Sequence, residues 1–188
     1  MVELSVVVSV YKNDDPKKFL AAVESVLNQS YSPDEVIICA DGPLSDGLNN
    51  IVSDLSTRSI VTVYRLQKNI GLGGSRHFAI MHSNGKYVAV MDADDISHHN
   101  RFKLQIAAHK ALEVDVLGGY IKETSETGKE QLRKVPLTHK DIFMRGKYSS
   151  PMNHVTIMIK RDSYISSGGY KAIRGVEDYD FFHRMLVM

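Results

Sequence analysis

Apolar residues follow two alternating patterns along the chain. Continuous apolar runs are typical of strands buried on both faces of a sheet, and apolar residues that recur every three or four positions are typical of helices. The runs predict strands at residues 4–10, 35–40, 60–66, 87–91 and 114–120. The helical spacing predicts helices at residues 16–27, 44–55, 71–83 and 101–112. This alternation predicts an α/β fold with a mostly parallel sheet and helices on both faces.

The start of the first predicted helix has a clear sequence signal. Asp15 can cap the free N–H groups, and Pro16 suits the first helical position because its missing N–H would have had no partner there. The buried stripe of this helix is predicted to contain Phe19, Leu20, Val23, Val26 and Leu27.

Beyond residue 120 the periodicity weakens. It predicts a polar turn at 123–129, a strand at 130–135, a helix at 138–144, a late strand at 154–160 and a final helix near Glu177. No long linker or repeat divides the chain, so we expect a single domain over residues 1–188. The last residues still have an apolar helical pattern, and we therefore expect the chain to be truncated at its C-terminus.

Composition excludes several classes of protein. The 188 residues are 43% hydrophobic and 24% charged, with a formal net charge of +1, which argues against a disordered tail and against a nucleic-acid-binding protein. Cys39 is the only cysteine and lies in an apolar run, so we expect a buried thiol and a reducing compartment. No apolar run reaches the roughly 18 residues of a membrane span. We expect a cytoplasmic protein.

Polar clusters follow four of the predicted strands. The carboxyl ends of parallel strands meet at one edge of a sheet, where α/β proteins bind ligands. The clusters are Tyr11 to Asn13, Asp41-Gly42, Asn69 to Arg76 and Asp92 to Asp95. We expect them to line one crevice.

The most informative cluster is Asp92-Ala93-Asp94-Asp95. In an extended chain, Asp92 and Asp94 would point to the same side, so both could hold one Mg²⁺ or Mn²⁺ ion, which prefer oxygen ligands. An alternative is that Asp94 or Asp95 caps a helix that begins near Ser97, but capping needs only one of the three acids.

These segments, together with Val6 to Tyr11 and Glu177-Asp178, occur in the order and approximate spacing of the family 2 glycosyltransferases. The chain resembles this family over nearly its whole length. The resemblance implies a GT-A fold, a nucleotide-sugar donor, a saccharide or lipid-linked saccharide acceptor, a divalent metal ion (Mn²⁺ or Mg²⁺) and transfer with inversion. We hypothesise a UDP-linked donor and a role in surface polysaccharide synthesis.

The resemblance also implies roles for individual residues at the donor. Asp41 resembles the residue that contacts the nucleobase, with Tyr11 beside it, and Asn69 and Arg76 resemble further donor contacts. Asp92 resembles the residue that contacts the ribose or the metal shell.

Three further roles concern the metal and the reaction. Asp94 resembles the direct metal ligand, and His154 lies where some relatives have an additional ligand. Asp178 matches the catalytic base, which would remove the proton of the acceptor hydroxyl.

Each assignment has a structural alternative. Glu177 and Asp178 could simply place negative charge in the first turn of a helix. Arg76 could be a solvated charge, and a lone histidine such as His154 is more often structural. The sequence also departs from the family pattern at Ala40, where many relatives have aspartate, and at His77, where asparagine often follows the arginine.

Rival functions fit less well. Phosphatases with a D-x-D motif carry it after the first strand, whereas here it follows the fourth. Dinucleotide oxidoreductases need G-x-G-x-x-G after the first strand, where this chain has Tyr11 to Asp14. A non-catalytic module that binds a nucleotide sugar is the alternative from another class.

Residues 129–147 contain six Lys or Arg residues and two acids. This segment could contact an anionic membrane at its inner face or a lipid-diphosphate acceptor. We favour a solvated basic loop, because so small an excess rarely anchors a protein. Neither the sugar, the linkage nor the oligomeric state can be inferred from the sequence.

Overall fold

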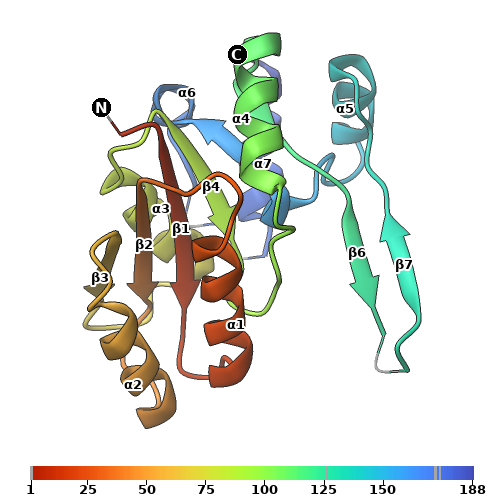
Figure 1. The fold of residues 1–188 in the computed structure, drawn as a ribbon. Coiled ribbons are helices and arrows are strands. Elements are labelled where there is room, and N and C mark those ends of the chain that lie inside the picture. Colours follow the sequence, from red (N-terminus) through yellow and green to blue (C-terminus); the bar gives the residue numbers. More distant parts are fainter. Residues whose placement is uncertain (1, 126, 172, 174) are drawn as a thin grey trace.

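The computed structural model describes residues 2–125, 127–171, 173 and 175–188. Its centre is a six-stranded sheet of order β3-β2-β1-β4-β8-β5 (Figure 1). The strands are β1 (Leu4–Val10), β2 (Glu35–Ala40), β3 (Val61–Arg65), β4 (Tyr87–Met91), β5 (Val116–Leu117) and β8 (Met158–Lys160). The first four pair in parallel, and β8 runs antiparallel between β4 and β5. The predicted mostly parallel α/β sheet is confirmed.

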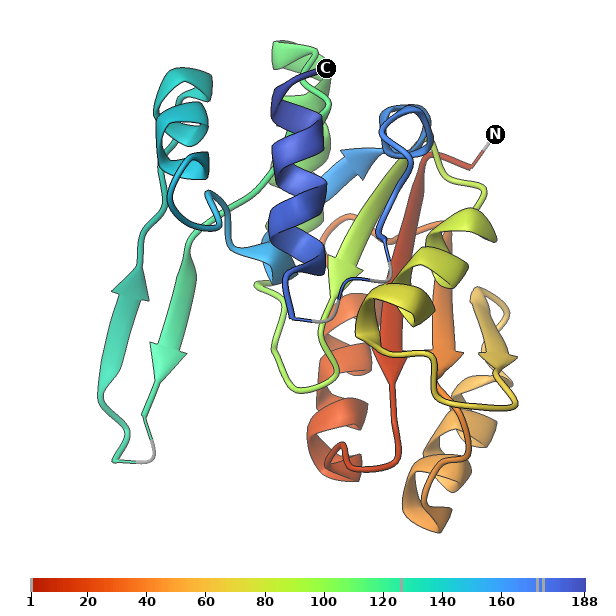
Figure 2. The same cartoon turned by 180° about the vertical axis from the view of Figure 1, so that it is seen from behind.

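Helices cover both faces of the sheet. One face packs against α1 (Pro16–Leu27), α2 (Asp46–Leu55) and α4 (Arg101–Leu112), as Figure 1 shows. The opposite face, seen in Figure 2, packs against α3 (Leu72–Met81), α6 (Arg161–Ser166) and α7 (Glu177–Leu186). Each side chain of β1 is buried because both faces are covered, which explains the uninterrupted apolar run in the sequence.

Two local predictions for α1 and β2 are confirmed. The Asp15 carboxylate accepts hydrogen bonds from the backbone N–H groups of Lys17 and Lys18, so it caps α1. Cys39 is a buried free thiol, and burial raises its pKa to about 12. One prediction is wrong: Leu20 is 36% exposed because it lies at the solvent edge of the α1 stripe.

Residues 114–124 differ from the prediction. The expected strand at 114–120 is reduced to β5, because Gly118 and Gly119 follow it and have no side chains to pack. A second strand, β6 (Ile121–Thr124), extends into the predicted turn and pairs with β7 (Glu130–Arg133). β7 corresponds to the strand predicted at 130–135, whereas β6 is mostly exposed and so lacks the apolar run on which the strand predictions depended.

The expected late strand at 154–160 is also shorter. It begins as a 3-10 turn, η1 (His154–Thr156), because Thr156 donates its hydroxyl to the Asn153 carbonyl and so closes the turn. Only β8 follows as a strand.

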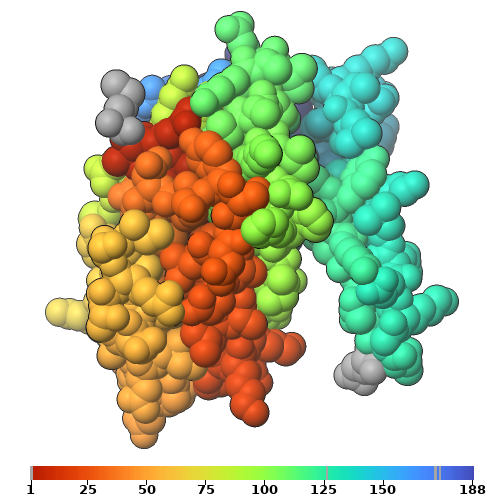
Figure 3. Space-filling view, in the orientation of Figure 1, coloured from red at the N-terminus to blue at the C-terminus, as the bar shows by residue number. Residues whose placement is uncertain are grey.

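The hairpin β6–β7 and α5 (His139–Gly146) form an arm beside the body of the molecule. In the space-filling view the hairpin is separated from α1 and from the start of α4 by an open hollow (Figure 3). Within the described ranges, no helix is both long and apolar enough to cross a membrane.

Candidate functional site

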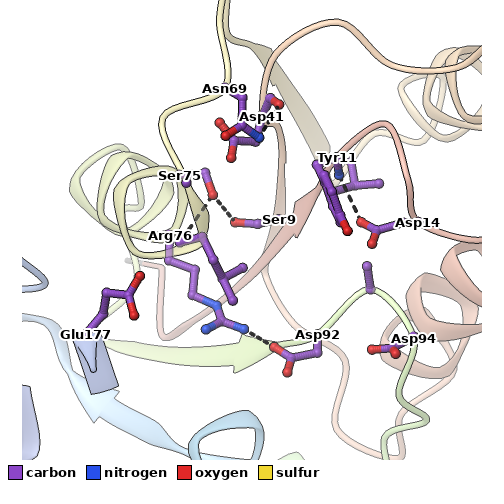
Figure 4. A pocket seen from close by; sticks show the side chains of 14 residues that line it. Ser9, Tyr11, Asp14, Asp41, Asn69, Ser75, Arg76, Asp92, Asp94 and Glu177 are labelled. Atoms are coloured by element: carbon purple, nitrogen blue, oxygen red, sulfur yellow. Dashed lines mark hydrogen bonds and ion pairs between the residues drawn. The ribbon is translucent and has the colours of Figure 1, made fainter. Parts of the chain in front are cut away.

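A pocket of about 410 Å³ lies at the carboxyl edge of the parallel strands. It brings together side chains from the loops after β1, β2, β3 and β4, as the topology of a parallel sheet requires (Figure 4). A fifth segment, the start of α7, adds Glu177. Six of the eight site residues predicted from the sequence line this pocket: Tyr11, Asp41, Asn69, Arg76, Asp92 and Asp94.

Asp41 is fixed at one wall of the pocket. It is 5% exposed, and its Oδ1 accepts a 2.7 Å hydrogen bond from the backbone N–H of Ile70. The Asn69 side chain donates to the Asp41 carbonyl at 3.2 Å. Gly42 allows this contact, because its φ is +86° and a Cβ there would lie 2.7 Å from the Asn69 backbone nitrogen. The carboxylate therefore has a rigid position, with its second oxygen left for a ligand.

The loop after β1 is held by an acid that the sequence analysis did not select. Asp14 accepts a 2.9 Å hydrogen bond from the backbone N–H of Tyr11, and both residues line the pocket. Burial raises the Asp14 pKa, and the charges of Asp94 and Asp92 raise it further. Asp14 could not be selected from the sequence, because the pattern singles out the neighbouring Asp15 as the helix cap and gives no separate signal for Asp14.

Arg76 and Asp92 form an ion pair across the pocket floor (Figure 4). Arg76 lies in the second turn of α3 and is only 7% exposed. Beside it, the Ser75 hydroxyl donates to the Ser9 hydroxyl at 3.0 Å, which ties α3 to β1. Arg76 is therefore not the solvated charge that was its structural alternative.

The chain turns immediately after Asp92, at Ala93 and Asp94. Asp92 and Asp94 therefore do not lie in one extended segment, contrary to the prediction, although both line the same pocket. The capping alternative is also wrong, because α4 begins only at Arg101. Burial raises the pKa of Asp95, with smaller contributions from the two neighbouring acids.

A smaller cavity of about 200 Å³ adjoins the pocket and shares Arg76, Asp92 and Glu177 with it. His154 and Tyr170 also line this cavity, and the His154 Nε2 lies 2.6 Å from the Tyr170 hydroxyl, to which it is hydrogen-bonded. Burial lowers the His154 pKa well below its usual value, so the imidazole is neutral.

Glu177 and Asp178 begin α7 but face different spaces. Glu177 lines both cavities, whereas Asp178 lines only the smaller one. The Asp178 carboxylate accepts a 3.3 Å hydrogen bond from the Ser150 hydroxyl. A Cβ at Gly73 would lie 2.7 Å from the Glu177 Cγ, so the glycine in α3 lets α7 approach closely. Both acids lie in the first turn of α7, as the structural alternative requires, and both also face a cavity, as a functional role requires.

The sequence model of the family described as "Glycosyl transferase family 2" matches residues 5–168. The chain belongs to this family. Its GT-A fold agrees with the six-stranded, mostly parallel sheet and its covering helices. Membership in a glycosyltransferase family leaves the phosphatase and oxidoreductase alternatives without support.

Two curated relatives are similar over almost the whole chain. The amylovoran biosynthesis glycosyltransferase AmsE of Erwinia amylovora is 31% identical over 183 residues, which are 97% of this chain and 69% of that protein. The UDP-Gal:alpha-D-GlcNAc-diphosphoundecaprenol beta-1,3-galactosyltransferase of Escherichia coli is 29% identical over 187 residues, 98% of this chain and 68% of that protein.

Two solved structures share the fold. TarS 1–349 of S. aureus, in complex with UDP-GlcNAc, superposes with a TM-score of 0.77 at 22% identity, over 98% of this chain and 53% of that one. The mannosyltransferase PcManGT of Pyrobaculum calidifontis, in complex with GDP-Man and Mn²⁺, gives a TM-score of 0.74 at 14% identity, over 98% and 52%. This chain thus spans about half the length of these solved chains.

The acids in the pocket of this family 2 glycosyltransferase suit a metal ion whose coordination is completed by phosphate and water oxygens. Among the described residues, no group of three or more His, Cys, Asp or Glu side chains is placed to hold a metal. Asp92 and Asp94 offer carboxylate oxygens at one pocket wall. Magnesium-type ions are commonly held by one or two carboxylates, with phosphate and water oxygens completing the shell. The donor set fits such an ion together with a nucleotide diphosphate.

Proposed function

We propose that this family 2 glycosyltransferase moves a sugar from a nucleotide-diphosphate donor, preferably UDP-linked, to an acceptor hydroxyl in the synthesis of a surface polysaccharide or another glycan. The observation that carries the proposal is the pocket at the carboxyl edge of the sheet, where an arginine and fixed carboxylates converge. Relatives support the donor class, because one carries UDP-Gal in its name and TarS has been solved with UDP-GlcNAc.

Different pocket residues bind different parts of the donor. The free oxygen of Asp41 accepts an N–H of the base, with Tyr11 lining the same end of the pocket. Asn69 and Arg76 contact the remainder of the donor, where a planar guanidinium can make paired hydrogen bonds to phosphate.

Asp94 is proposed as the ligand of Mn²⁺ or Mg²⁺, and Asp92 as part of the coordination shell of that ion. A bound divalent ion neutralises the charge that develops on the leaving diphosphate. His154 is left out of this shell, because it lines the smaller cavity, which Asp94 does not line, and no three His, Cys, Asp or Glu side chains among the described residues are placed for one metal.

Asp178 is proposed as the base for inversion. It lies in the smaller cavity, beside the pocket that would hold the nucleotide. A base that removes the acceptor proton from the face opposite the leaving group produces inversion in one step. The adjoining cavity provides a place for the reacting sugar and the acceptor hydroxyl.

We place the reaction in the cytoplasm at the inner face of the membrane, with a saccharide or a lipid-linked saccharide as acceptor. The Escherichia coli relative, whose name includes a diphosphoundecaprenol acceptor, supports this class.

Calorimetric titration of UDP, GDP and dTDP, each with Mn²⁺ and again with excess chelator, tests the donor site. We expect metal-dependent binding of UDP that is stronger than that of GDP or dTDP. Asp94→Asn should weaken the binding measured with Mn²⁺ and leave the chelator titration unchanged. Equal or tighter binding of GDP or dTDP would contradict the UDP assignment, and no binding of any nucleotide would contradict the donor site.

Substitution of the two acids of α7 tests catalysis. Asp178→Asn should keep donor affinity and reduce transfer by about a thousandfold, within the usual range for loss of a general base. Glu177→Gln is the matched control. Because Glu177 lines the donor pocket, we expect this variant to change donor affinity more than Asp178→Asn does. Unchanged transfer by Asp178→Asn would remove it as the base. Donor binding by wild type without transfer to any acceptor would favour the non-catalytic module.

A further inference from the structure

Arg76 is a buried cation with unused hydrogen-bonding capacity. A guanidinium has five N–H donors. In this structure one Nη pairs with the Asp92 carboxylate, whereas the Nε is buried and has no hydrogen-bond partner among the residues that the structure describes. An unpartnered N–H in a side chain that is only 7% exposed is costly, and it indicates that another acceptor binds here at some stage.

Asp92 has two competing partners. The proposed function assigns it to the shell of a divalent ion, yet here its carboxylate neutralises Arg76. Both residues line the donor pocket, so an incoming diphosphate meets the guanidinium and an incoming metal meets the carboxylate. A metal that arrives alone must compete with a cation that is already in place.

We propose that Arg76 is a resident counter-ion for Asp92 that couples metal binding to diphosphate binding. The proposal rests on the proposed function. In the free protein Arg76 offsets the charge of Asp92. When the diphosphate binds, its oxygens take over the guanidinium, and Asp92 becomes free to enter the metal shell. Each ligand then removes the obstacle to the other, which is positive cooperativity.

The local charges give this exchange a physical basis. Asp92 and Asp94 line the same pocket, so two like charges lie close together when no cation is present. Pairing with Arg76 relieves one of these charges in the free protein. A phosphate offers the guanidinium at least two oxygens in a plane, a better geometry than a single carboxylate oxygen provides.

Binding of Mn²⁺ to the whole chain, measured by electron paramagnetic resonance of the free ion, tests the coupling. Each protein is titrated with Mn²⁺ alone and again with saturating UDP. In wild type we expect UDP to increase Mn²⁺ affinity by about tenfold or more, a common size for coupling between two sites. Arg76→Gln should bind Mn²⁺ alone about tenfold more tightly than wild type, and UDP should then increase that affinity much less.

A double-mutant cycle separates competition for Asp92 from general repulsion of the metal by a nearby charge. If Arg76 acts through Asp92, Arg76→Gln should leave Mn²⁺ affinity unchanged in an Asp92→Asn background. Arg58→Gln is the matched control, because Arg58 also pairs with a carboxylate, that of Glu24, but on the exposed surface. Arg76→Lys keeps the charge and provides a second variant should the glutamine variant fail to fold, which circular dichroism reports. It should bind Mn²⁺ alone about as weakly as wild type.

The outcomes distinguish this inference from the function on which it rests. If wild type binds no nucleotide with or without Mn²⁺, the donor site fails and the coupling fails with it. If wild type shows the coupling and Arg76→Gln keeps it at full size, only the role of Arg76 is overturned. An equal gain in Mn²⁺ affinity with and without Asp92 would also overturn it, because the effect would then be general repulsion.

Discussion

Asp95 shows how a single carboxylate can reduce the stability of the empty protein. Burial and the nearby charges of Asp92 and Asp94 raise its pKa, and the cations Arg101 and Lys18 only partly offset this effect. The folded protein therefore binds a proton at Asp95 more tightly than the unfolded chain does. Above the folded pKa the charge costs stability, and this cost disappears as the pH falls below the unfolded value of about 4.

Asp95→Asn should therefore raise the melting temperature of the metal-free protein at pH 8, by about 1–2 °C. The gain should shrink towards zero at pH 4, where the wild-type carboxyl also becomes neutral. Differential scanning calorimetry with chelator at the two pH values measures this. The same shift at both pH values, or a lower melting temperature at pH 8, would contradict the electrostatic cause.

For single residues, the sequence indicated which side chains belong to the site but not which of them contact one another. Tyr11, Asp41, Asn69 and Asp92 could be placed in one crevice because each follows a strand. The ion pair between Arg76 and Asp92 could not be predicted, since it depends on how far α3 leans over the end of β4. Asp14 had no pattern that distinguished it from Asp15.

Two contacts between elements hold the site in shape. The first is the approach of α7 to Gly73 of α3, and the second is the packing of Arg101 beneath the end of β4. The Arg101 guanidinium donates to the carbonyls of Val90 and Ile157, at 3.0 and 3.1 Å. Burial lowers its pKa to about 10, so it remains charged at neutral pH. This one side chain joins α4 to the strand that carries the acids and to the segment after His154.

Arg101→Met should lower the free energy of unfolding by about 2–3 kcal/mol, because it removes the charge-assisted hydrogen bonds to the carbonyls of Val90 and Ile157, although Ile157 keeps the Val90 N–H as a donor. Urea denaturation followed by circular dichroism measures the change. Lys103→Met, on the exposed side of the same helix, is the control and should change stability by less than about 0.5 kcal/mol. Equal effects of the two substitutions would show that Arg101 has no special role.

Gly73→Ala tests the contact between α3 and α7. Glycine to alanine within a helix normally stabilises by about 1 kcal/mol. Here the new methyl group would lie 2.7 Å from the Glu177 Cγ, so we expect no gain in melting temperature and donor affinity that is lower by about tenfold. Gly119→Ala is the control, because its nearest atom would be 3.9 Å away. A stabilised Gly73→Ala variant with full donor affinity would refute the close contact.

The elements themselves were predictable where periodicity was strong. Strands β1, β2 and β4 are buried on both faces, and their apolar runs coincide with the observed bounds. After residue 114 the predicted strand at 130–135 and the predicted helix at 138–144 correspond to β7 and α5, but β6 was not predicted. Its side chains are mostly exposed and it is held mainly by backbone pairing with β7, so it leaves no hydrophobic signal in the sequence.

Charge is unevenly distributed over the whole molecule. Residues 129–147 carry six basic and two acidic side chains, so the rest of the chain has seventeen basic and twenty acidic ones. The segment includes β7 and α5, which form much of the arm beside the body (Figure 3). Within the hairpin Arg133 pairs with Glu123, which offsets part of this charge, whereas Glu130 of the segment pairs with Lys122 outside it. The segment as a whole keeps a weak basic excess.

We expect this segment to bind anionic phosphatidylglycerol vesicles at low ionic strength and to release them near 0.15 M salt, where charges are screened beyond about 8 Å. Vesicle flotation at the two salt concentrations measures this. Lys134→Glu with Lys140→Glu should abolish the binding. Lys17→Glu with Lys18→Glu makes the same charge change on α1 and should retain it. Loss of binding in both double variants would locate the effect in net charge rather than in the arm.

The contact of Glu177 with Gly73 also affects how the protein is made. About a hundred residues separate the two positions in the sequence. During translation, β1 to α3 leave the ribosome well before α7 can cover them. Until then, the nascent sheet exposes the apolar face that later packs against Phe181 and Phe182. We expect this exposed face to be the most aggregation-prone surface of the nascent chain during the interval, and a stalled ribosome would present a half-built donor pocket.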